Sequence, residues 1–495
     1  MKHIFFFMFT FFFPVVLNAE PSRPVVFIPG IFGSELSTNR ERLWGGIWSL
    51  NNLRQLTIIS GPHKPDDSIE AKQVIKEISL FGIIKVVEYA RTLYPILKDE
   101  GYENQKGNFF VFPYDWRQSN YDTASRLQDF MNSPALKGKQ VDMIAHSMGG
   151  LVAQIYIKNM EGANRVKKLI NLAVPFRGSV DTLRTLTDGW GTVQNGLAGG
   201  LGIVRRFALT MPSLYEMLPD YRYCCILGRE EDPKRRPYNL FDYANWSEIR
   251  WLDDPMGISA DGVREALDRG AELRALAKQP YPSNMRVYYI AGAGIDTTAQ
   301  YYVDTTEKAI STYKQSTDQY QGDGTVIEES ASNGDLSQAF ASFAEHQTIF
   351  NDDSAKTTLR RILCETCGAP DNYGFRNASA FTTDGKILSV TSVGVITSQN
   401  YVKAGDTVTS ELRIRGEGAS PNKADVTLQV AYVSDGVEEI LKEVALAGSL
   451  EAPTIGLYKS EIRGLNKVGA VRIKYMIKGM ATLSDYVVVI PKDNQ

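Results

Sequence analysis

The chain has 495 residues and a nearly balanced charge, with 54 Lys and Arg residues against 57 Asp and Glu residues. Hydrophobic residues make up 43% of it and aromatic residues 11%, which is typical of a globular protein and excludes a disordered or fibrous one. The small net charge of −3 excludes a broad basic surface, so nucleic acid is not an expected partner. The length predicts more than one domain.

The first residues have the pattern of a secretory signal. Lys2 supplies a positive charge, an apolar run rich in Phe extends from Ile4 to Leu17, and Ala19 is a small residue at the cleavage position. We therefore expect residues 1–19 to be a signal peptide and the mature protein to be exported, to the periplasm or beyond. An uncleaved membrane anchor is the alternative, although the run is short for a span.

Short apolar segments then alternate with amphipathic ones through residues 20–370, which predicts an α/β domain with a parallel sheet and crossover helices. The expected strands are Val25–Ile28, Phe109–Phe112, Val141–Ala145, Val166–Ala173 and Val287–Ala291. The expected helices are Ile83–Asp99, Thr123–Met131 and Leu151–Met160, with another that begins near Asp353. Sheets of this kind bind ligands at the carboxyl ends of their strands.

Two segments interrupt this alternation. A long insertion at about residues 175–285 is expected to form a cap that shapes a pocket or lid. An earlier segment, Leu43–Asp67, concentrates apolar side chains among Gly and Pro, namely Trp44, Trp48, Leu50, Leu53, Ile58 and Ile59. Two interpretations of that segment stay open: Trp44 and Trp48 dip into a lipid surface, or the segment packs beneath the cap.

The composition changes after Cys367. From about Ala380 to Pro491, runs of alternating polar and apolar residues rich in Val and Thr are broken by turn residues, which predicts a β-sandwich accessory domain within residues 371–495. Because this region contains neither His nor Cys, we expect the catalytic chemistry to lie in the first domain.

Export would place the four cysteines in an oxidising compartment, where pairing is expected. The disulfide candidates are Cys224, Cys225, Cys364 and Cys367. The spacing of Cys364 and Cys367 favours a local bond, whereas a bond between the neighbours Cys224 and Cys225 would be strained. Three pairings are possible, and the sequence does not choose among them.

The strongest chemical signal is the segment Val141–Leu151, in which an apolar strand runs through His146-Ser147-Met148-Gly149-Gly150 into a helix. This context predicts a nucleophile elbow with Ser147 on the tight turn. Ala145 stands where the motif usually has its first glycine. The backbone N–H of Met148, at the start of the helix, can bind an oxyanion.

A serine hydroxyl needs a general base, and the chain contains only four histidines: His3, His63, His146 and His346. His346 alone follows Ser147 at a position where this type of fold places its base, in the order serine, acid, histidine. His3 leaves with the signal, His63 precedes the serine, and the His146 side chain should point away from it.

Two aspartates fit the position of the acid, Asp296 and Asp323. The glycines on both sides of Asp323 permit a sharp turn that could aim its carboxylate at the imidazole, which favours Asp323. A second oxyanion donor is expected in the glycine-rich loop after the first strand, from the N–H of Ile31, with Phe32 as the alternative.

Six motifs, in this order, resemble the lecithin:cholesterol acyltransferase family of α/β-hydrolases. They occupy residues 27–36, 112–117, 145–150, 175–179, 212–219 and 322–326. The resemblance implies an α/β-hydrolase domain with Ser147, Asp323 and His346 as its triad and Ile31 and Met148 as oxyanion donors. It also implies a cap over a lipid acyl pocket, with structural or lid-supporting roles for Asp115 and Arg117. The bacterial style of the signal and the C-terminal sandwich depart from the animal enzyme.

The expected function is that of an exported serine acyltransferase or lipolytic acyl hydrolase, which acts on glycerolipid or phospholipid esters through an acyl-enzyme. The expected partners are a lipid ester, at a membrane or lipid surface, and an acceptor that is water or an alcohol; no metal or cofactor is required. Phe32, Trp44 and Trp48 are the substrate or lid candidates. The alternatives are a lipase or esterase without transferase activity and a catalytically inert secreted lipid- or surface-binding protein. The oligomeric state stays open.

Overall fold

The computed structural model of the chain describes most of the first domain and much of the C-terminal region. The described residues are 23–45, 49–58, 68–75, 89–189, 200–221, 224–228, 233–248, 252, 259–293, 295–304, 309–314, 321–334, 339–342, 344–363, 378–381, 387–397, 401–417, 425–434, 437–447, 449–452, 455–467, 469–478 and 482–490. The predicted signal peptide, Trp48, Ile59, Cys364 and Cys367 lie outside these ranges.

A six-stranded parallel sheet forms the centre of the first domain, in the order β15-β10-β7-β6-β1-β5. Its strands are β1 (Val25–Ile28), β5 (Phe109–Val111), β6 (Val141–His146), β7 (Val166–Leu172), β10 (Arg286–Gly292) and β15 (Ala339–Ser342). Five of them lie where the sequence predicts strands. The edge strand β15 was missed because it is only four residues long and consists mostly of Ala and Ser, which have low strand propensity.

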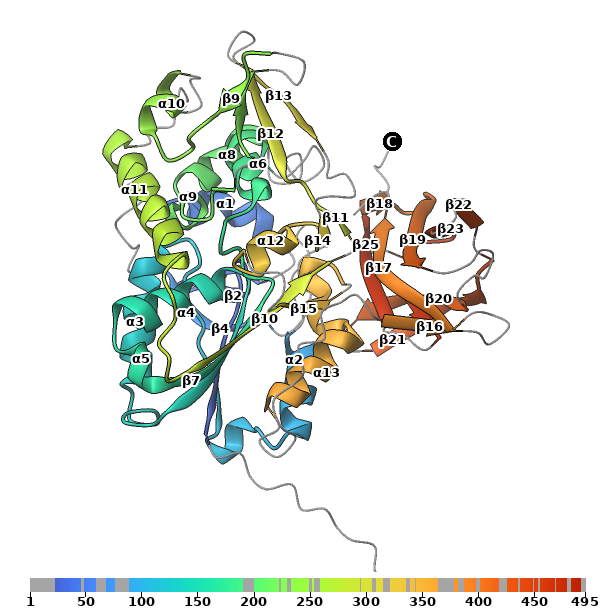
Figure 1. The fold of residues 1–495 in the computed structure, drawn as a ribbon, viewed down its shortest axis with the longest axis horizontal. Helices are drawn as coiled ribbons and strands as arrows, with labels where there is room; N and C mark the ends of the chain where they lie inside the picture. Colours follow the sequence, from blue (N-terminus) through green and yellow to red (C-terminus); the bar gives the residue numbers. More distant parts are fainter. Residues whose placement is uncertain are drawn as a thin grey trace, which may run out of the picture.

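Helices cover both faces of this sheet (Figure 1). The helices of the two faces are α2 (Tyr89–Asp99), α3 (Asn120–Met131), α4 (Met148–Asn159), α5 (Gly162–Arg165) and α13 (Asp353–Leu363). Val26 and Ile28 of β1 belong to the apolar cluster that includes α3 and α4, whereas Val25 and Phe27 belong to the cluster of α2 and α13. This alternation along one strand produces a three-layer α/β architecture, which confirms the predicted fold class.

The insertion at residues 175–285 is mainly helical. Its helices are α6 (Val180–Asp188), α8 (Leu201–Leu209), α9 (Pro212–Tyr215), α10 (Tyr243–Glu248) and α11 (Ala260–Ala277). Two short strands, β8 (Ile226–Leu227) and β9 (Arg236–Pro237), join β12 (Gln300–Asp304) and β13 (Ala309–Lys314) in a four-stranded sheet. The remaining short elements of the first domain are β2 (Ser34–Ser37), β3 (Arg42–Trp44), η1 (Ser49–Asn52), α1 (Leu53–Leu56), β4 (Glu70–Val74), η2 (Asn104–Lys106), β11 (Ile295–Asp296), β14 (Gln321–Gly322), α12 (Glu328–Ala331) and η4 (His346–Asn351).

Trp44 is part of the core and does not reach a lipid surface. Its indole is fully buried, its Nε1 donates to the carbonyl of Phe32 at 3.1 Å, and its ring lies 5.1 Å from that of Trp116. Leu50, Leu53, Leu56 and Ile58 are buried as well. Of the two interpretations of this segment, insertion into lipid is therefore wrong for Trp44, because burying the indole against other aromatic rings removes it from the surface.

The described residues of the C-terminal region form ten strands, in two five-stranded sheets of order β16-β17-β19-β23-β22 and β18-β25-β24-β20-β21. They are β16 (Ala378–Phe381), β17 (Ile387–Thr397), β18 (Tyr401–Lys403), β19 (Val408–Glu417), β20 (Val426–Ser434), β21 (Val437–Ala445), β22 (Ser449–Ala452), β23 (Ile455–Ile462), β24 (Gly469–Ile477) and β25 (Thr482–Ile490). Buried side chains from both sheets share one core, and the Tyr475 hydroxyl donates across it to Ser410 Oγ at 2.8 Å. This arrangement is a β-sandwich.

The β-sandwich lies beside the first domain (Figure 1). Its strand β25 contacts η4, and its strand β17 contacts β11. Both contacted segments belong to the loops that follow the carboxyl ends of β10 and β15, so the sandwich lies close to the edge of the sheet where ligands are expected.

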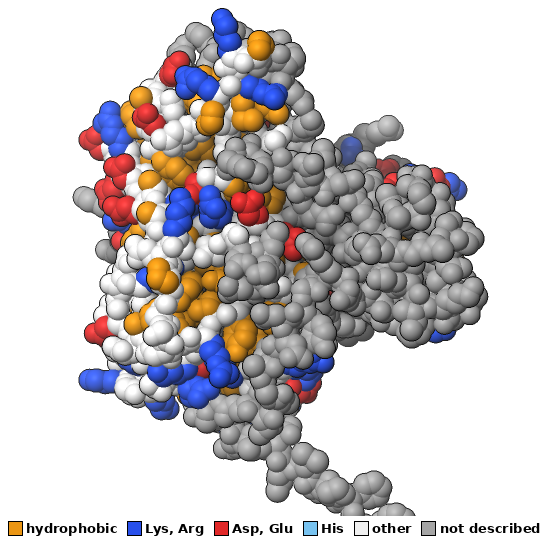
Figure 2. Space-filling model, in the orientation of Figure 1, with side chains coloured by type: hydrophobic (Ala, Val, Ile, Leu, Met, Phe, Trp, Pro, Cys, Tyr) orange, Lys and Arg blue, Asp and Glu red, His pale blue; other side chains and the backbone are white. Residues whose placement is uncertain are grey.

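The surface of the described part carries charges of both signs. Figure 2 shows Lys and Arg side chains interspersed with Asp and Glu side chains on one face of the molecule. Within the described residues, no helix combines the length and apolar composition that a membrane span requires.

A buried carboxylate joins the cap to helix α3, which covers one face of the central sheet. Glu216, directly after α9, accepts hydrogen bonds from the backbone N–H of Asn120 at 2.7 Å and from its side-chain amide at 2.8 Å, at the start of α3. The hydroxyl of Ser119 donates to the same carboxylate, and the buried Arg274 of α11 donates to the Glu216 carbonyl at 2.6 Å. Burial raises the pKa of Glu216 from 4.5 to about 7 despite these donors.

The raised pKa predicts a pH-dependent stability. Because the folded protein holds this proton more tightly than the unfolded chain, the contribution of Glu216 is complete below its unfolded pKa of 4.5 and is lost as the pH rises through about 7. The free energy of unfolding of the wild type should therefore fall relative to that of Glu216→Gln by up to about 3 kcal/mol between pH 5 and pH 8. Urea unfolding at the two pH values measures this, with Glu272→Gln, an exposed position of α11, as the control. An equal difference at both pH values would contradict it.

Candidate active site

Ser147 lies on a strained turn between the central strand β6 and helix α4. Its φ angle is +51°, in a region that residues other than glycine rarely adopt. The following glycine makes the turn possible: a Cβ at Gly149 would collide with the carbonyl oxygens of Pro29 and Ile28. Burial of Ser147 within the body of the protein holds this conformation in place.

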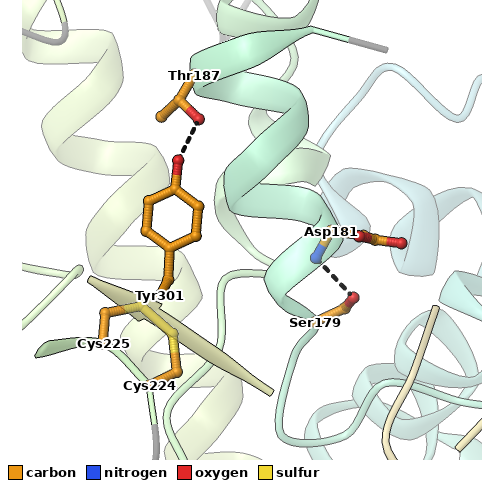
Figure 3. The surroundings of a disulfide bond; sticks show 6 residues. All are labelled: Ser179, Asp181, Thr187, Cys224, Cys225 and Tyr301. Carbon is orange, nitrogen blue, oxygen red and sulfur yellow. Dashed lines mark hydrogen bonds between the residues drawn. A yellow bond between two sulfur atoms is a disulfide. The ribbon is translucent and has the colours of Figure 1, made fainter. Parts of the chain in front are cut away.

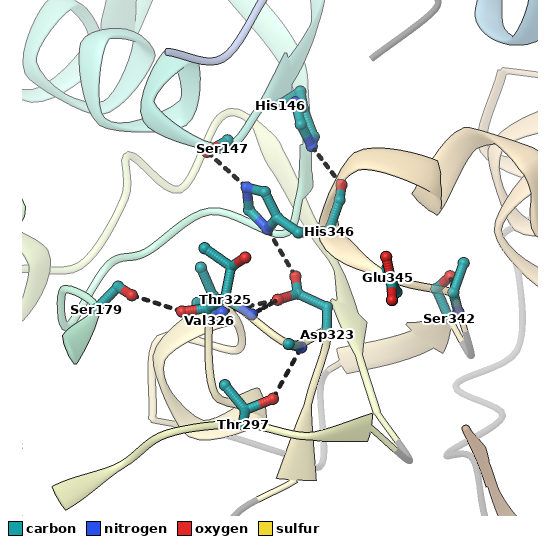
Figure 4. A network of polar contacts seen from close by, with 12 residues as sticks. His146, Ser147, Ser179, Thr297, Asp323, Thr325, Val326, Ser342, Glu345 and His346 are labelled. Atoms are coloured by element: carbon teal, nitrogen blue, oxygen red, sulfur yellow. Dashed lines mark hydrogen bonds and ion pairs between the residues drawn. The ribbon is translucent and has the colours of Figure 1, made fainter. Parts of the chain in front are cut away.

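His346 joins Ser147 to Asp323 by hydrogen bonds (Figure 4). Its Nε2 lies 2.8 Å from Ser147 Oγ, and its Nδ1 lies 2.8 Å from Asp323 Oδ2. All three side chains are buried. Since a carboxylate can only accept, Nδ1 carries the ring proton, and Nε2 is left to accept from the serine hydroxyl.

The loop that carries Asp323 fixes its carboxylate from the other side. Oδ1 accepts from the backbone N–H of Thr325 at 3.0 Å and of Val326 at 2.7 Å. The Asp323 loop lies so close to the end of β10 that position 292 must be a glycine, because a Cβ at Gly292 would collide with the Cβ of Asp323. The carboxylate is therefore held in one orientation by hydrogen bonds from the backbone of its own turn.

The loop also has support from two neighbouring hydroxyl groups. The backbone N–H of Gly324 donates to Thr297 Oγ1 at 2.9 Å, and the Ser179 hydroxyl, at the start of α6, donates to the carbonyl of Thr325. Asp296, the other sequence candidate for the acid, lies in β11, which pairs with β14. The structure thus joins His346 to Asp323, the candidate that its flanking glycines favoured.

The loop after β1 lies directly against Ser147. A Cβ at Gly30 would lie 2.9 Å from the Ser147 Cβ, and the N–H of Gly33 donates to the Gly30 carbonyl at 3.1 Å to close a turn. Within the described residues, the backbone N–H groups of Ile31 and Met148 donate to no partner. Neither N–H group is used by another hydrogen bond of the described residues, as a predicted oxyanion donor requires. Phe32, in the same turn, has a φ of +62° and is partly buried.

Asp115 and Arg117 form a buried ion pair. The Arg117 Nη2 donates to Asp115 Oδ2 at 2.6 Å, and its Nη1 donates to the carbonyl of Leu56 at 2.9 Å. The pair therefore fixes helix α1 to the loop after β5, in agreement with the structural role that the resemblance implied.

Sequence reasoning missed one residue near the site, Tyr89. Its hydroxyl lies 2.9 Å from His146 Nδ1 and accepts from the backbone N–H of Gly30 at 3.0 Å. A tyrosine at the start of an amphipathic helix gives no sequence signal that sets it apart from a core residue. In the part of the chain that is described, no group of three or more His, Cys, Asp or Glu side chains is placed to hold a metal ion.

The structure makes one choice among the cysteine pairings that the sequence left open. Cys224 and Cys225 are bonded to each other, next to the start of α6 and to Tyr301 (Figure 3). Ser179, which supports the Asp323 loop, lies in the same region. The disulfide is therefore part of the cap near the candidate site.

Comparisons with known proteins agree with the motifs. The family model described as lecithin:cholesterol acyltransferase matches residues 64–226, which include Ser147. Lecithin-cholesterol acyltransferase-like 4 of Arabidopsis thaliana is 24% identical, over 72% of this chain and 78% of its own length. Phospholipase A(1) LCAT3 of the same plant is 25% identical, over 62% of this chain and 82% of its own length.

Among solved structures, a chain of the Tle4–Tli4 complex is 17% identical with a TM-score of 0.47, and the match covers 69% of this chain and 98% of that one. The family model and the two plant relatives point to the same group of proteins as the six sequence motifs. The chain is therefore similar to the lecithin:cholesterol acyltransferase family over residues 64–226 and to these two plant relatives over most of their length.

Proposed function

We propose that this protein is an exported serine-dependent enzyme that cleaves acyl esters of glycerolipids or phospholipids and passes the acyl group to water or to an alcohol. The family supports an ester hydrolase or acyltransferase that acts on lipids. The observation that carries the proposal is the hydrogen-bonded series Ser147–His346–Asp323 at a strained strand-to-helix turn.

In the proposed first step, Ser147 Oγ attacks the ester carbonyl while His346 Nε2 takes its proton. The 2.8 Å distance between these atoms is short enough for direct transfer. The oxygen of the resulting tetrahedral intermediate is negative, and we expect the N–H groups of Ile31 and Met148 to stabilise it. Asp323 holds the ring tautomer and stabilises the imidazolium that forms.

In the second step the protonated His346 gives its proton to the leaving alcohol, and an acyl group remains on Ser147. Water or an alcohol, deprotonated by His346, then attacks this acyl-enzyme and releases the product.

Two further features support a lipid substrate and export. A phospholipase A(1) is among the relatives, and the helical cap at residues 175–285 contacts the Asp323 loop through Ser179. The charged and apolar pattern of residues 1–19 supports export, and the Cys224–Cys225 disulfide is compatible with an oxidising compartment.

Substitution of the three residues tests the mechanism. Ser147→Ala, Asp323→Asn and His346→Gln should each lower kcat for a p-nitrophenyl ester by roughly 10³-fold or more, because the three groups act as a unit. The double variant Ser147→Ala/His346→Gln should lose little more than either single one. Asp296→Asn is the matched control and should keep near-normal turnover. Near-normal activity in Asp323→Asn, with loss in Asp296→Asn, would transfer the acid role to Asp296.

Covalent labelling separates an enzyme from an inert binding protein. A fluorophosphonate should label the purified wild type on Ser147 and leave Ser147→Ala unlabelled, since the reagent reports a serine activated by a base. Mass spectrometry of the tryptic peptides identifies the labelled residue. An unlabelled Ser147 in folded wild-type protein would favour the binding protein.

The acyl acceptor is the finer part of the proposal, because hydrolysis and transfer share one acyl-enzyme. The cap can exclude water from the site and admit a lipid alcohol, so we expect transfer beside hydrolysis. The test offers phospholipid vesicles that contain a sterol or a long-chain alcohol, with Ser147→Ala as the control, and identifies the products by mass spectrometry. Free fatty acid alone, at every alcohol content tried, would leave a phospholipase or lipase.

A further inference from the structure

A buried series of hydrogen bonds joins the loop after β1 to the backbone of His346. The Gly30 N–H donates to the Tyr89 hydroxyl at 3.0 Å, that hydroxyl lies 2.9 Å from His146 Nδ1, and His146 Nε2 lies 3.1 Å from the carbonyl oxygen of His346. Tyr89 and His146 are both buried. The series does not include the Ser147 hydroxyl, whose own partner is the side chain of His346.

The direction of each hydrogen bond follows from its ends. The His346 carbonyl can only accept, so His146 Nε2 must carry the proton. Burial and the nearby His346 hold the pKa of His146 well below its usual value, so the ring is neutral and Nδ1 keeps its lone pair. The Tyr89 hydroxyl therefore donates to Nδ1 and accepts from Gly30, and every group in the series is satisfied.

The two ends of this series are the segments that the proposed reaction depends on. Gly30 precedes Ile31, whose N–H is the proposed oxyanion donor, and a Cβ at Gly30 would lie 3.0 Å from His146 Nδ1. At the other end, His346 is held at both sides of its Cα, because its N–H donates to the Asp323 carbonyl at 2.9 Å and its carbonyl accepts from His146. A shift of His146 would therefore move both segments.

Aromatic packing fixes the rings themselves. The Tyr89 ring lies 4.7 Å from that of Phe27 and 5.6 Å from that of Phe350, and the His146 ring lies 5.4 Å from that of Phe350. Phe350 belongs to η4, the same short helix that begins with His346. The contacts leave each ring little freedom to rotate away from its hydrogen bonds.

We propose that Tyr89 and His146 are positioning residues that set the oxyanion loop and the general base in one fixed arrangement. This inference rests on the proposed function, and neither residue takes part in bond making. His146 is more than a space-filling residue of the turn around Ser147. Its Nδ1 contacts the Tyr89 hydroxyl, which holds the Gly30 loop, and its Nε2 contacts the carbonyl of His346. In this role His146 is neutral, with Nε2 as a donor and Nδ1 as an acceptor.

The experiment compares kcat, KM and melting temperature for a p-nitrophenyl ester in five full-length variants: Tyr89→Phe, His146→Leu, Tyr89→Phe/His146→Leu, His146→Gln and Tyr94→Phe. Tyr94→Phe is the matched control, since it removes a hydroxyl from the same helix, at a partly buried ring that packs on Phe109. We expect Tyr89→Phe and His146→Leu each to lower kcat on the order of tenfold with KM changed less than about twofold.

The remaining variants test the coupling. The double variant should have about the same kcat as either single variant, because each substitution alone already removes the hydrogen bond between Tyr89 and His146. His146→Gln places an amide donor where Nε2 was and should recover part of the kcat that His146→Leu loses. Independent losses that multiply in the double variant, losses that follow the melting temperature alone, or a Tyr89→Phe enzyme equal to Tyr94→Phe would overturn the inference.

Ser147→Ala distinguishes failure of this inference from failure of the proposed function. If Ser147→Ala is inactive while Tyr89→Phe and His146→Leu have wild-type kcat, the positioning role fails and the serine mechanism stands. If Ser147→Ala retains turnover, the proposed function itself fails, and the positioning role fails with it.

Discussion

The positive φ of Ser147 is the constraint on which the rest of the site depends. A side chain in this conformation is held at the end of the buried strand β6, and the chain can turn into α4 only because Gly149 and Gly150 leave room for Ile28, Pro29 and Val174. The strain is maintained by the surrounding sheet, since β6 is paired on both sides, with β1 and β7. A serine on a flexible loop would lose this geometry.

Each group around Ser147 follows a different strand and is fixed by hydrogen bonds in which a backbone group takes part. Asp323 is held by two N–H groups of its own turn, His346 by the carbonyl of Asp323, and Gly30 by the Tyr89 hydroxyl. The arrangement is thereby set before a substrate arrives, which lowers the reorganisation that the reaction requires. The β-sandwich contacts η4, which begins with His346, and β11, which pairs with the strand that precedes Asp323.

The cap is attached to this frame by buried polar contacts. Glu216 binds the start of α3, Arg274 of α11 donates to carbonyls in the loop after β7, and Ser179 donates into the Asp323 loop. Charged groups that are buried in this way are costly unless every partner is present, so they favour one position of the cap over many. The cap and the site are therefore ordered together.

The sequence by itself determined the α/β class, five of the six central strands, the Ser147 elbow and the position of His346, because strand periodicity, glycine spacing and chain order are local properties. It narrowed the acid to Asp296 or Asp323 and favoured Asp323 for its flanking glycines, but only the structure shows the contact of its carboxylate with His346 Nδ1. Only the tertiary structure placed Trp44 in the core, bonded Cys224 to Cys225 and brought Tyr89 to His146. Those outcomes depend on contacts between segments far apart in the chain, which no local pattern encodes, and the short, alanine-rich β15 owes its strand conformation to pairing with β10.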